Sequence, residues 1–156
     1  MAIPLVILAI LCLPLAVAFT LVRYRRKGDW RIGGTVGLAL AFVFFGIGHF
    51  VQTEDMATML PPWVPQRTAL IYATGVLEWL LALGLLVPRT RRAAGWGCLA
   101  VLIAFFPANV YAALNHVGTG GHQWGPIYLV IRTPLQLILI VWAYWFGVKR
   151  FEPRSP

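Results

Sequence analysis

Acidic residues, charge and cysteine are all scarce in this chain, and each shortage excludes a class of protein. Among the 156 residues, five are Asp or Glu and 60% are hydrophobic, whereas a soluble domain of this size would expose far more charge. The two cysteines, Cys12 and Cys98, form no C-x-x-C pair, so the chain carries no dithiol redox centre. There is also no C-x-x-C-H sequence for covalent haem, no phosphate-binding loop and no Ser/His/Asp arrangement.

The chain has instead five long apolar stretches separated by short connectors. They cover residues 2–22, 33–51, 68–87, 94–114 and 126–147. Each is close to the ~20 residues that a helix needs to cross the hydrocarbon core of a membrane. The first stretch has no basic residue before it and ends in a basic run at 23–27, an arrangement typical of a stop-transfer sequence. We therefore expect a retained helix rather than a cleaved signal peptide.

The basic residues lie mainly in every second connector. They follow the first, third and fifth apolar stretches, at 23–31, 89–92 and 149–154, whereas the second and fourth connectors contribute only Arg67. Lys and Arg near membrane spans are retained on the cytoplasmic side. We therefore expect a multi-pass protein of the cell (cytoplasmic) membrane, with its N-terminus outside and its C-terminus inside. The net charge of +8 then favours contact with anionic head groups of the lipid bilayer, and no nucleic-acid binding is expected.

The predicted fold class is an all-α integral membrane protein. Connectors this short make sequential helices pack as antiparallel neighbours. We expect a four-helix transmembrane bundle over 33–148, preceded by one extra transmembrane helix and a basic loop over 1–32, and followed by a basic cytoplasmic tail over 149–156. Small residues on the helix surfaces predict points of close approach. These pairs are Gly33 with Gly37, Ala69 with Ala73, and Ala108 with Ala112.

Five polar side chains inside the apolar stretches are the candidate functional residues. They are His49, Glu78, Asn109, Arg132 and Gln136. An ionisable group in hydrocarbon is costly unless it is paired or hydrated, so such residues are functional candidates by default. The topology places all five between the midplane and the outer ends of four helices. We expect an ion pair between Glu78 and Arg132, which would either line a ligand pocket or fix the helix order.

His49 has several open interpretations. It could carry a proton, bind a metal, donate a hydrogen bond to a quinone, or be a histidine near the interface that water satisfies. With Glu78, and with His116 and His122 of the last outer loop, a metal site is conceivable, but the spacing matches no standard site and we predict none. Glu78 and His49 are therefore the candidate catalytic residues, while Asn109, Arg132 and Gln136 are candidates for binding a cofactor.

The second connector adds one more pocket candidate, Trp63. Residues 52–66 contain three prolines, two methionines and this tryptophan, a composition unsuited to a solvated loop. We expect a stiff segment at the outer membrane interface, where Trp63 can sit at the level of the head groups. It would either anchor a short connection or cover a pocket that opens outward.

Several short motifs together resemble those of the DoxX/DoxD-like membrane proteins. They are G-I-G-H-F at 46–50, L-P-P-W-V-P at 60–65, T-G-V-L-E at 74–78, P-R-T-R-R-A-A at 88–94, P-A-N at 107–109, R-T-P-L-Q at 132–136 and W-A-Y at 142–144. The resemblance covers roughly residues 33–147, so the first span is an addition to the family's usual four-helix unit. It implies a small subunit of a membrane oxidoreductase, such as the thiosulfate:quinone oxidoreductases that contain DoxD-type members.

The family's four-helix core is also similar to sterol-isomerase and sigma-2-type bundles. By that analogy Glu78 would be the central acid, with His49 and Asn109 lining the pocket. Three hypotheses follow from the sequence. In the first, the chain is a quinone-facing subunit of an oxidoreductase, and a partner subunit holds the redox centre. In the second, it is a bundle that binds or isomerises a lipophilic molecule through Glu78. In the third, it is a purely structural membrane subunit. In the first, a quinone is the candidate cofactor.

Overall fold

The computed structural model describes residues 2–25, 29–118 and 121–149, and within these ranges every regular element is helical. The elements are α1 (Ala2–Arg25), α2 (Arg31–Val51), α3 (Thr53–Thr58), α4 (Arg67–Leu86), α5 (Arg91–Leu114), the 3-10 helix η1 (His122–Tyr128), α6 (Leu129–Trp142) and the π-helix η2 (Ala143–Val148). The last three follow one another directly, with a kink at Gly125, whose backbone is not helical (φ 74°, ψ −155°). Five helices are long and apolar enough to cross a membrane, which confirms the five predicted stretches.

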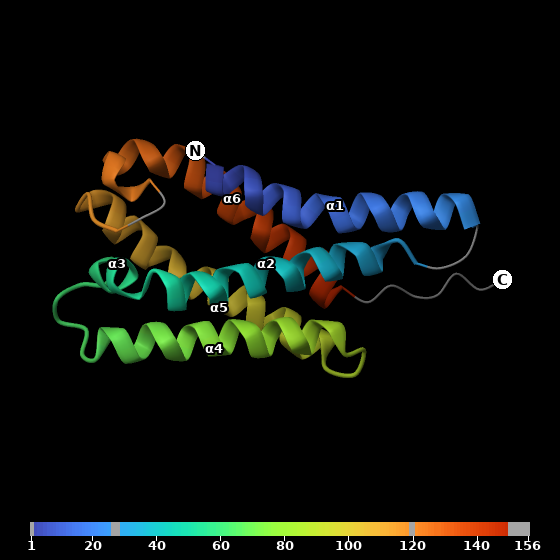
Figure 1. The fold of residues 1–156 in the computed structure, drawn as a ribbon, viewed down its shortest axis with the longest axis horizontal. Helices are drawn as coiled ribbons and strands as arrows, with labels where there is room; N and C mark the ends of the chain where they lie inside the picture. The colour runs from blue at the N-terminus through green and yellow to red at the C-terminus, as the bar shows by residue number, and fades with distance from the viewer. Residues whose placement is uncertain (1, 26–28, 119–120, 150–156) are drawn as a thin grey trace.

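The long helices lie in two sets, as Figure 1 shows. α1, α2 and α4 run side by side with α2 in the middle, while α5 and α6 cross them obliquely. α5 packs against α4 and against both ends of the last segment, η1 and η2. α1 packs chiefly on α2 and contacts α6 only slightly, so it lies at the edge of the other four helices.

Glycines set the distance between α1 and α2. A Cβ atom at Gly37 would lie 2.5 Å from the Leu11 carbonyl oxygen, and one at Gly33 would overlap the backbone of α1 at Pro14. Only residues without a side chain allow two helices to approach this closely, so the prediction for Gly33 and Gly37 is confirmed.

The other two predicted pairs differ. Ala69 and Ala73 are exposed, so that prediction is wrong: Gly75, on a different face of α4, makes the approach to α2. Hydrophobic spacing does not show which of several small residues faces the partner helix. In the third pair, Ala112 is fully buried whereas Ala108 is half-buried.

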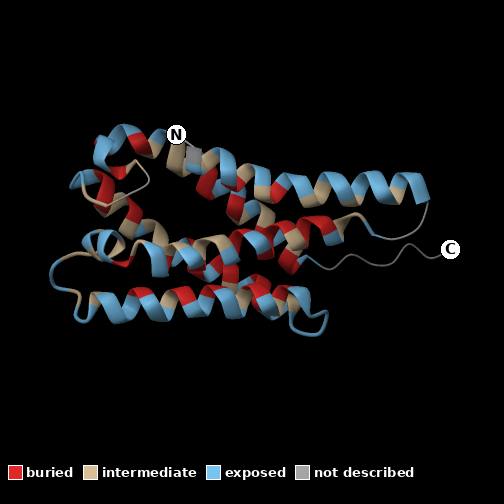
Figure 2. Ribbon diagram, in the orientation of Figure 1, coloured by how far each residue is buried: buried red, intermediate tan, exposed pale blue. Residues whose placement is uncertain are grey.

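The interior is apolar and so is much of the outside. Fully buried side chains such as Leu38, Phe42 and Leu139 fill the space between the helices, and Figure 2 shows the buried positions on the faces that the helices turn to one another. The outward faces carry leucine and valine that are more than half exposed, for example Leu83 and Val130. Exposed apolar surface this extensive is unsuited to water and suits contact with lipid.

The second connector contains a short helix that the sequence analysis does not predict. α3 follows α2 after one residue, and the hydroxyl of Thr53 at its start donates to the carbonyl of His49 at 2.6 Å. The proline-containing segment after it ends at Gln66, which has a left-handed conformation with φ of 48°. Of the basic segments, residues 26–28 and 150–156 lie outside the described residues.

Candidate functional site

The closest contact between α2 and α4 positions the candidate site. A Cβ atom at Gly75 of α4 would lie 2.8 Å from the Cβ of His49 and 3.3 Å from the carbonyl oxygen of Gly46 on α2. The side chain of Trp79 lies over Gly46 and donates from Nε1 to the Val43 carbonyl at 3.2 Å. Because Gly75 has no side chain, the imidazole of His49 lies directly against α4.

Two groups of α4 contact one nitrogen of the His49 ring. Its Nδ1 lies 3.0 Å from the hydroxyl of Thr74 and 3.2 Å from the carbonyl oxygen of Ile71. That hydroxyl in turn donates to carbonyls of its own helix. A carbonyl can only accept a hydrogen bond, so the bond to Ile71 forms in the tautomer that carries its proton on Nδ1.

The opposite ring nitrogen faces a carboxyl group. His49 Nε2 lies 3.6 Å from Oε2 of Glu78, and both residues are buried. This distance is too long for a hydrogen bond but within the range of an ion pair. In this tautomer Nε2 can accept a proton, so a further proton shared with Oε2 would lie either on the carboxyl, leaving both groups neutral, or on the imidazole, leaving both charged. The pair is therefore a potential proton donor and acceptor inside an apolar bundle.

A second polar cluster lies between α5 and η1. The Asn109 amide donates from Nδ2 to the carbonyl of Phe105 at 2.8 Å, and its Oδ1 is 3.1 Å from Nε2 of His122. His122 is buried, with its ring edge-on to Tyr128 at a centroid distance of 4.8 Å. The sequence analysis assigns His122 to the last outer loop. The signal that could have found it is its position four residues before the last apolar stretch.

Phe105 connects the two clusters. Its ring stacks on the imidazole of His49 with centroids 6.0 Å apart and planes inclined by 29°, and its carbonyl accepts the bond from Asn109. One residue of α5 thus contacts both the α2–α4 cluster and the α5–η1 cluster. The predicted gathering of polar groups from four helices is found as two neighbouring clusters, with Phe105 between them.

The prediction of an ion pair between Glu78 and Arg132 is wrong. The ion-pair partner of Glu78 is His49, because the Gly46–Gly75 contact presses α2 onto the face of α4 that carries Glu78. Among the described residues, Arg132 forms no ion pair with Glu78. Its Nε is buried without a hydrogen-bond partner, and the same holds for Oε2 of Glu78.

Gln136 and Trp63 occupy very different environments. Gln136 is buried and donates from Nε2 to the Leu102 carbonyl of α5, while its Oε1 has no hydrogen-bond partner. Trp63 is 81% exposed on the second connector and takes no part in either cluster. Of the predicted pocket residues, Asn109 and Gln136 therefore bridge elements of the bundle, and Trp63 lies apart from them.

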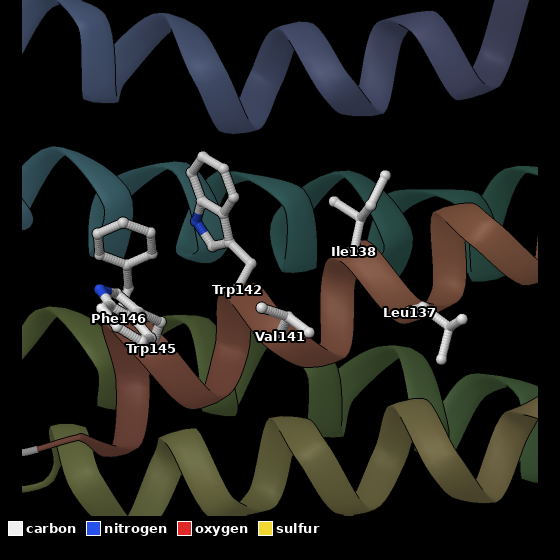
Figure 3. A pocket seen from close by; sticks show the side chains of 6 residues that line it. All are labelled: Leu137, Ile138, Val141, Trp142, Trp145 and Phe146. Carbon is white, nitrogen blue, oxygen red and sulfur yellow. The ribbon is translucent and has the colours of Figure 1, made fainter.

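Apolar grooves on the described part of the chain lie outside the polar clusters. One, of about 330 Å³, lies on α6 and η2 and is lined by Leu137, Ile138, Val141, Trp142, Trp145 and Phe146 (Figure 3). The other, of about 80 Å³, lies between α2 and α4. Among the described residues, no three His, Cys, Asp or Glu side chains gather closely enough to hold a metal ion.

Comparison with known families gives one match. Residues 38–147, which span most of α2 through η2 and leave out α1, match the family model described as "Domain of unknown function (DUF8561)". Searches among curated proteins and among solved structures find no match. Since the matched segment is most of the chain and contains both polar clusters, this protein belongs to the DUF8561 family.

Proposed function

We propose that this chain is a five-span protein of the cell membrane, with its N-terminus outside and its C-terminus in the cytoplasm. In this arrangement α2, α4, α5 and the α6–η2 segment form a four-helix transmembrane bundle, and α1 is an added helix packed on α2. Support comes from the five apolar helices, their apolar outward faces and the basic residues in alternate connectors.

Cysteine labelling tests this topology. In a variant with Cys12 and Cys98 replaced by alanine, a cysteine at exposed Gln66 should react with a membrane-impermeant maleimide added to intact cells. A cysteine at exposed Arg89 should react only after the cells are lysed. The reverse pattern would contradict the proposed orientation, and labelling of both sites in intact cells would contradict the span count.

Within this topology, the function supported best is that of a quinone-facing membrane subunit of an oxidoreductase. The observation that carries the proposal is the buried His49–Glu78 pair, in which an imidazole nitrogen faces a carboxyl oxygen at 3.6 Å. A quinone takes up protons when it is reduced, and an intramembrane group that can supply or accept one is suited to this step. The resemblance to DoxX/DoxD-like proteins points to the same class of complex.

The buried groups without partners have a role in this proposal. Oε2 of Glu78, Nε of Arg132 and Oε1 of Gln136 lack hydrogen bonds, and a buried polar group left unpaired costs about 1–3 kcal/mol. A lipophilic molecule with carbonyl and hydroxyl groups would offer such partners. The chain itself has no electron carrier, so a partner subunit would supply the electrons while His49 and Glu78 handle the proton.

Complementation tests the proposal. In a strain lacking this protein, Glu78→Gln and His49→Phe should fail to restore quinone-linked respiration although the variants accumulate normally in the membrane. The matched control is Glu54→Gln, which removes an exposed acid in α3 and should restore respiration fully. Full restoration by Glu78→Gln would refute a role for the pair in proton transfer.

A structural role is the second candidate, and a specific observation favours it. His49 is bonded to Thr74 and Ile71, both on α4, so the polar pair also fixes how α2 sits on α4. Under this alternative, Glu78→Gln and His49→Phe lower the amount of assembled protein. Respiration then falls only in proportion to that amount. A third candidate, acid–base catalysis on a lipophilic substrate such as an isomerisation, uses the same pair and predicts lost turnover of that substrate in Glu78→Gln.

A further inference from the structure

The larger apolar groove follows one face of the last helical segment. From Leu137 to Phe146 it runs along about 14 Å of helix, and all six residues that line it are apolar or aromatic. Leu137 and Val141 are more than half exposed. Figure 3 shows the six side chains along α6 and η2, with Trp142 and Ile138 pointing to the side on which α1 runs.

Hydrogen bonds to α2 hold this groove in shape. Trp142 donates from its indole Nε1 to the carbonyl of Gly34 at 2.9 Å, and the Thr35 hydroxyl donates to the carbonyl of Phe146 at 3.0 Å. The rings of Trp142 and Phe146 lie 4.9 Å apart. The segment from 143 to 148 is a π-helix, a form that occurs often at functional sites. The groove is therefore a formed surface rather than a chance gap between mobile side chains.

One end of the groove meets positive charge. Lys149 directly follows η2, and its Nζ lies 3.8 Å from the centroid of the Trp145 ring, which lines the groove. On the other side, the guanidinium carbon of Arg31 lies 5.6 Å from the Trp30 ring, which packs edge-on against Phe146 at 6.2 Å. Lys149 thus contacts a residue of the groove directly, and Arg31 is one aromatic ring away from another.

We propose that this groove binds an anionic phospholipid, with one acyl chain along α6 and η2 and the phosphate at Lys149 and Arg31. The groove matches the shape and charge of such a lipid. Its apolar length fits an acyl chain, and it ends in cations that can bind a phosphate. The aromatic rings beside these cations favour the level of the head groups in a membrane. A second copy of this chain is a poorer occupant, because a symmetric contact across this face would bring the same cations together. A net negative head group is preferred over a zwitterionic one, because the latter carries its own cation beside the phosphate and so has no net charge to attract Lys149 and Arg31.

Native mass spectrometry from lipid nanodiscs tests the site. With equal amounts of phosphatidylglycerol and phosphatidylcholine, the wild type should keep the anionic lipid preferentially. Lys149→Gln should weaken its retention about fivefold, as expected for the loss of one cation at an anionic head group. Val141→Trp, which places a large side chain in the groove at an exposed position, should reduce retention of the lipid through its chain.

Two variants serve as controls for these changes. Arg89→Gln removes a basic residue that does not line the groove, and Leu83→Trp adds a large side chain on the outward face of α4. Both should keep the wild-type lipid. Equal retention of the two lipids, or wild-type retention in Lys149→Gln and Val141→Trp together, would overturn the proposal. A dimer that Val141→Trp abolishes would also overturn it and assign this face to a second copy.

Discussion

Replacing Gly75 by alanine should force α2 and α4 apart and disturb the His49–Glu78 pair. The new Cβ atom would lie 2.8 Å from the Cβ of His49, 2.9 Å from the ring of Phe50 and 3.3 Å from the carbonyl of Gly46. The first of these atoms is fixed to its backbone and cannot rotate away. Relief of the clash therefore requires a movement of one helix.

The size of the effect follows from two opposing terms. Adding a methyl group to a tightly packed contact typically costs about 1–3 kcal/mol, while replacing glycine by alanine inside a helix contributes about 0.5–1 kcal/mol of stability. We expect a net loss of about 1–2 kcal/mol. For a chain of this size that lowers the midpoint of thermal unfolding by about 2–8 °C.

A nearby glycine provides the matched control. At Gly48, on the same helix as His49, a new Cβ would meet only the methyl carbon of Met56 at 3.4 Å, an ordinary van der Waals distance. Gly48→Ala should therefore leave the unfolding midpoint unchanged or raise it. Both variants should be measured in the same detergent by thermal unfolding, followed through tryptophan fluorescence. If Gly75→Ala were as stable as Gly48→Ala, the close contact between α2 and α4 would be refuted.

The remaining predictions concern three other contacts and use the same thermal assay. Asn109→Ala removes the buried hydrogen bond to His122 and should cost about 1–3 kcal/mol. Asn115→Ala at the exposed end of α5 should change stability by less than about 0.5 kcal/mol. Equal effects would show that the buried hydrogen bond contributes nothing. Thr35→Val removes the bond to the Phe146 carbonyl and should cost about 0.6 kcal/mol, the average for such bonds in membrane proteins; a more stable variant would argue against that bond. Gly37→Val meets the backbone of α1 and should destabilise at least as much as Gly75→Ala, and a neutral result would mean that α1 does not pack there.

The helices were predictable from the sequence because the signal for them is local. A run of about 20 apolar residues identifies a span wherever its neighbours lie, and all five runs are helices in the structure. The candidate residues His49, Glu78 and Asn109 were also predictable, because polar groups inside apolar runs stand out. α3 was missed because six residues rich in polar side chains, placed between two long spans, carry no apolar period.

The partners of the candidate residues were not predictable in the same way. Whether Glu78 faces Arg132 or His49 depends on how α2 and α4 are rotated about their axes, and the contact between Gly46 and Gly75 sets that rotation. His122 was misjudged for a related reason. Its position next to Asn109 depends on how η1 folds back onto α5, a packing that no periodicity in the sequence records.

Native mass spectrometry of the protein released gently from its own membranes tests the central claim most directly. The wild type should carry a stoichiometric quinone, Glu78→Gln should have lost it, and Glu54→Gln should carry it like the wild type. A wild-type protein that carries no quinone, or a Glu78→Gln variant that keeps it in full, would contradict a quinone site at the His49–Glu78 pair.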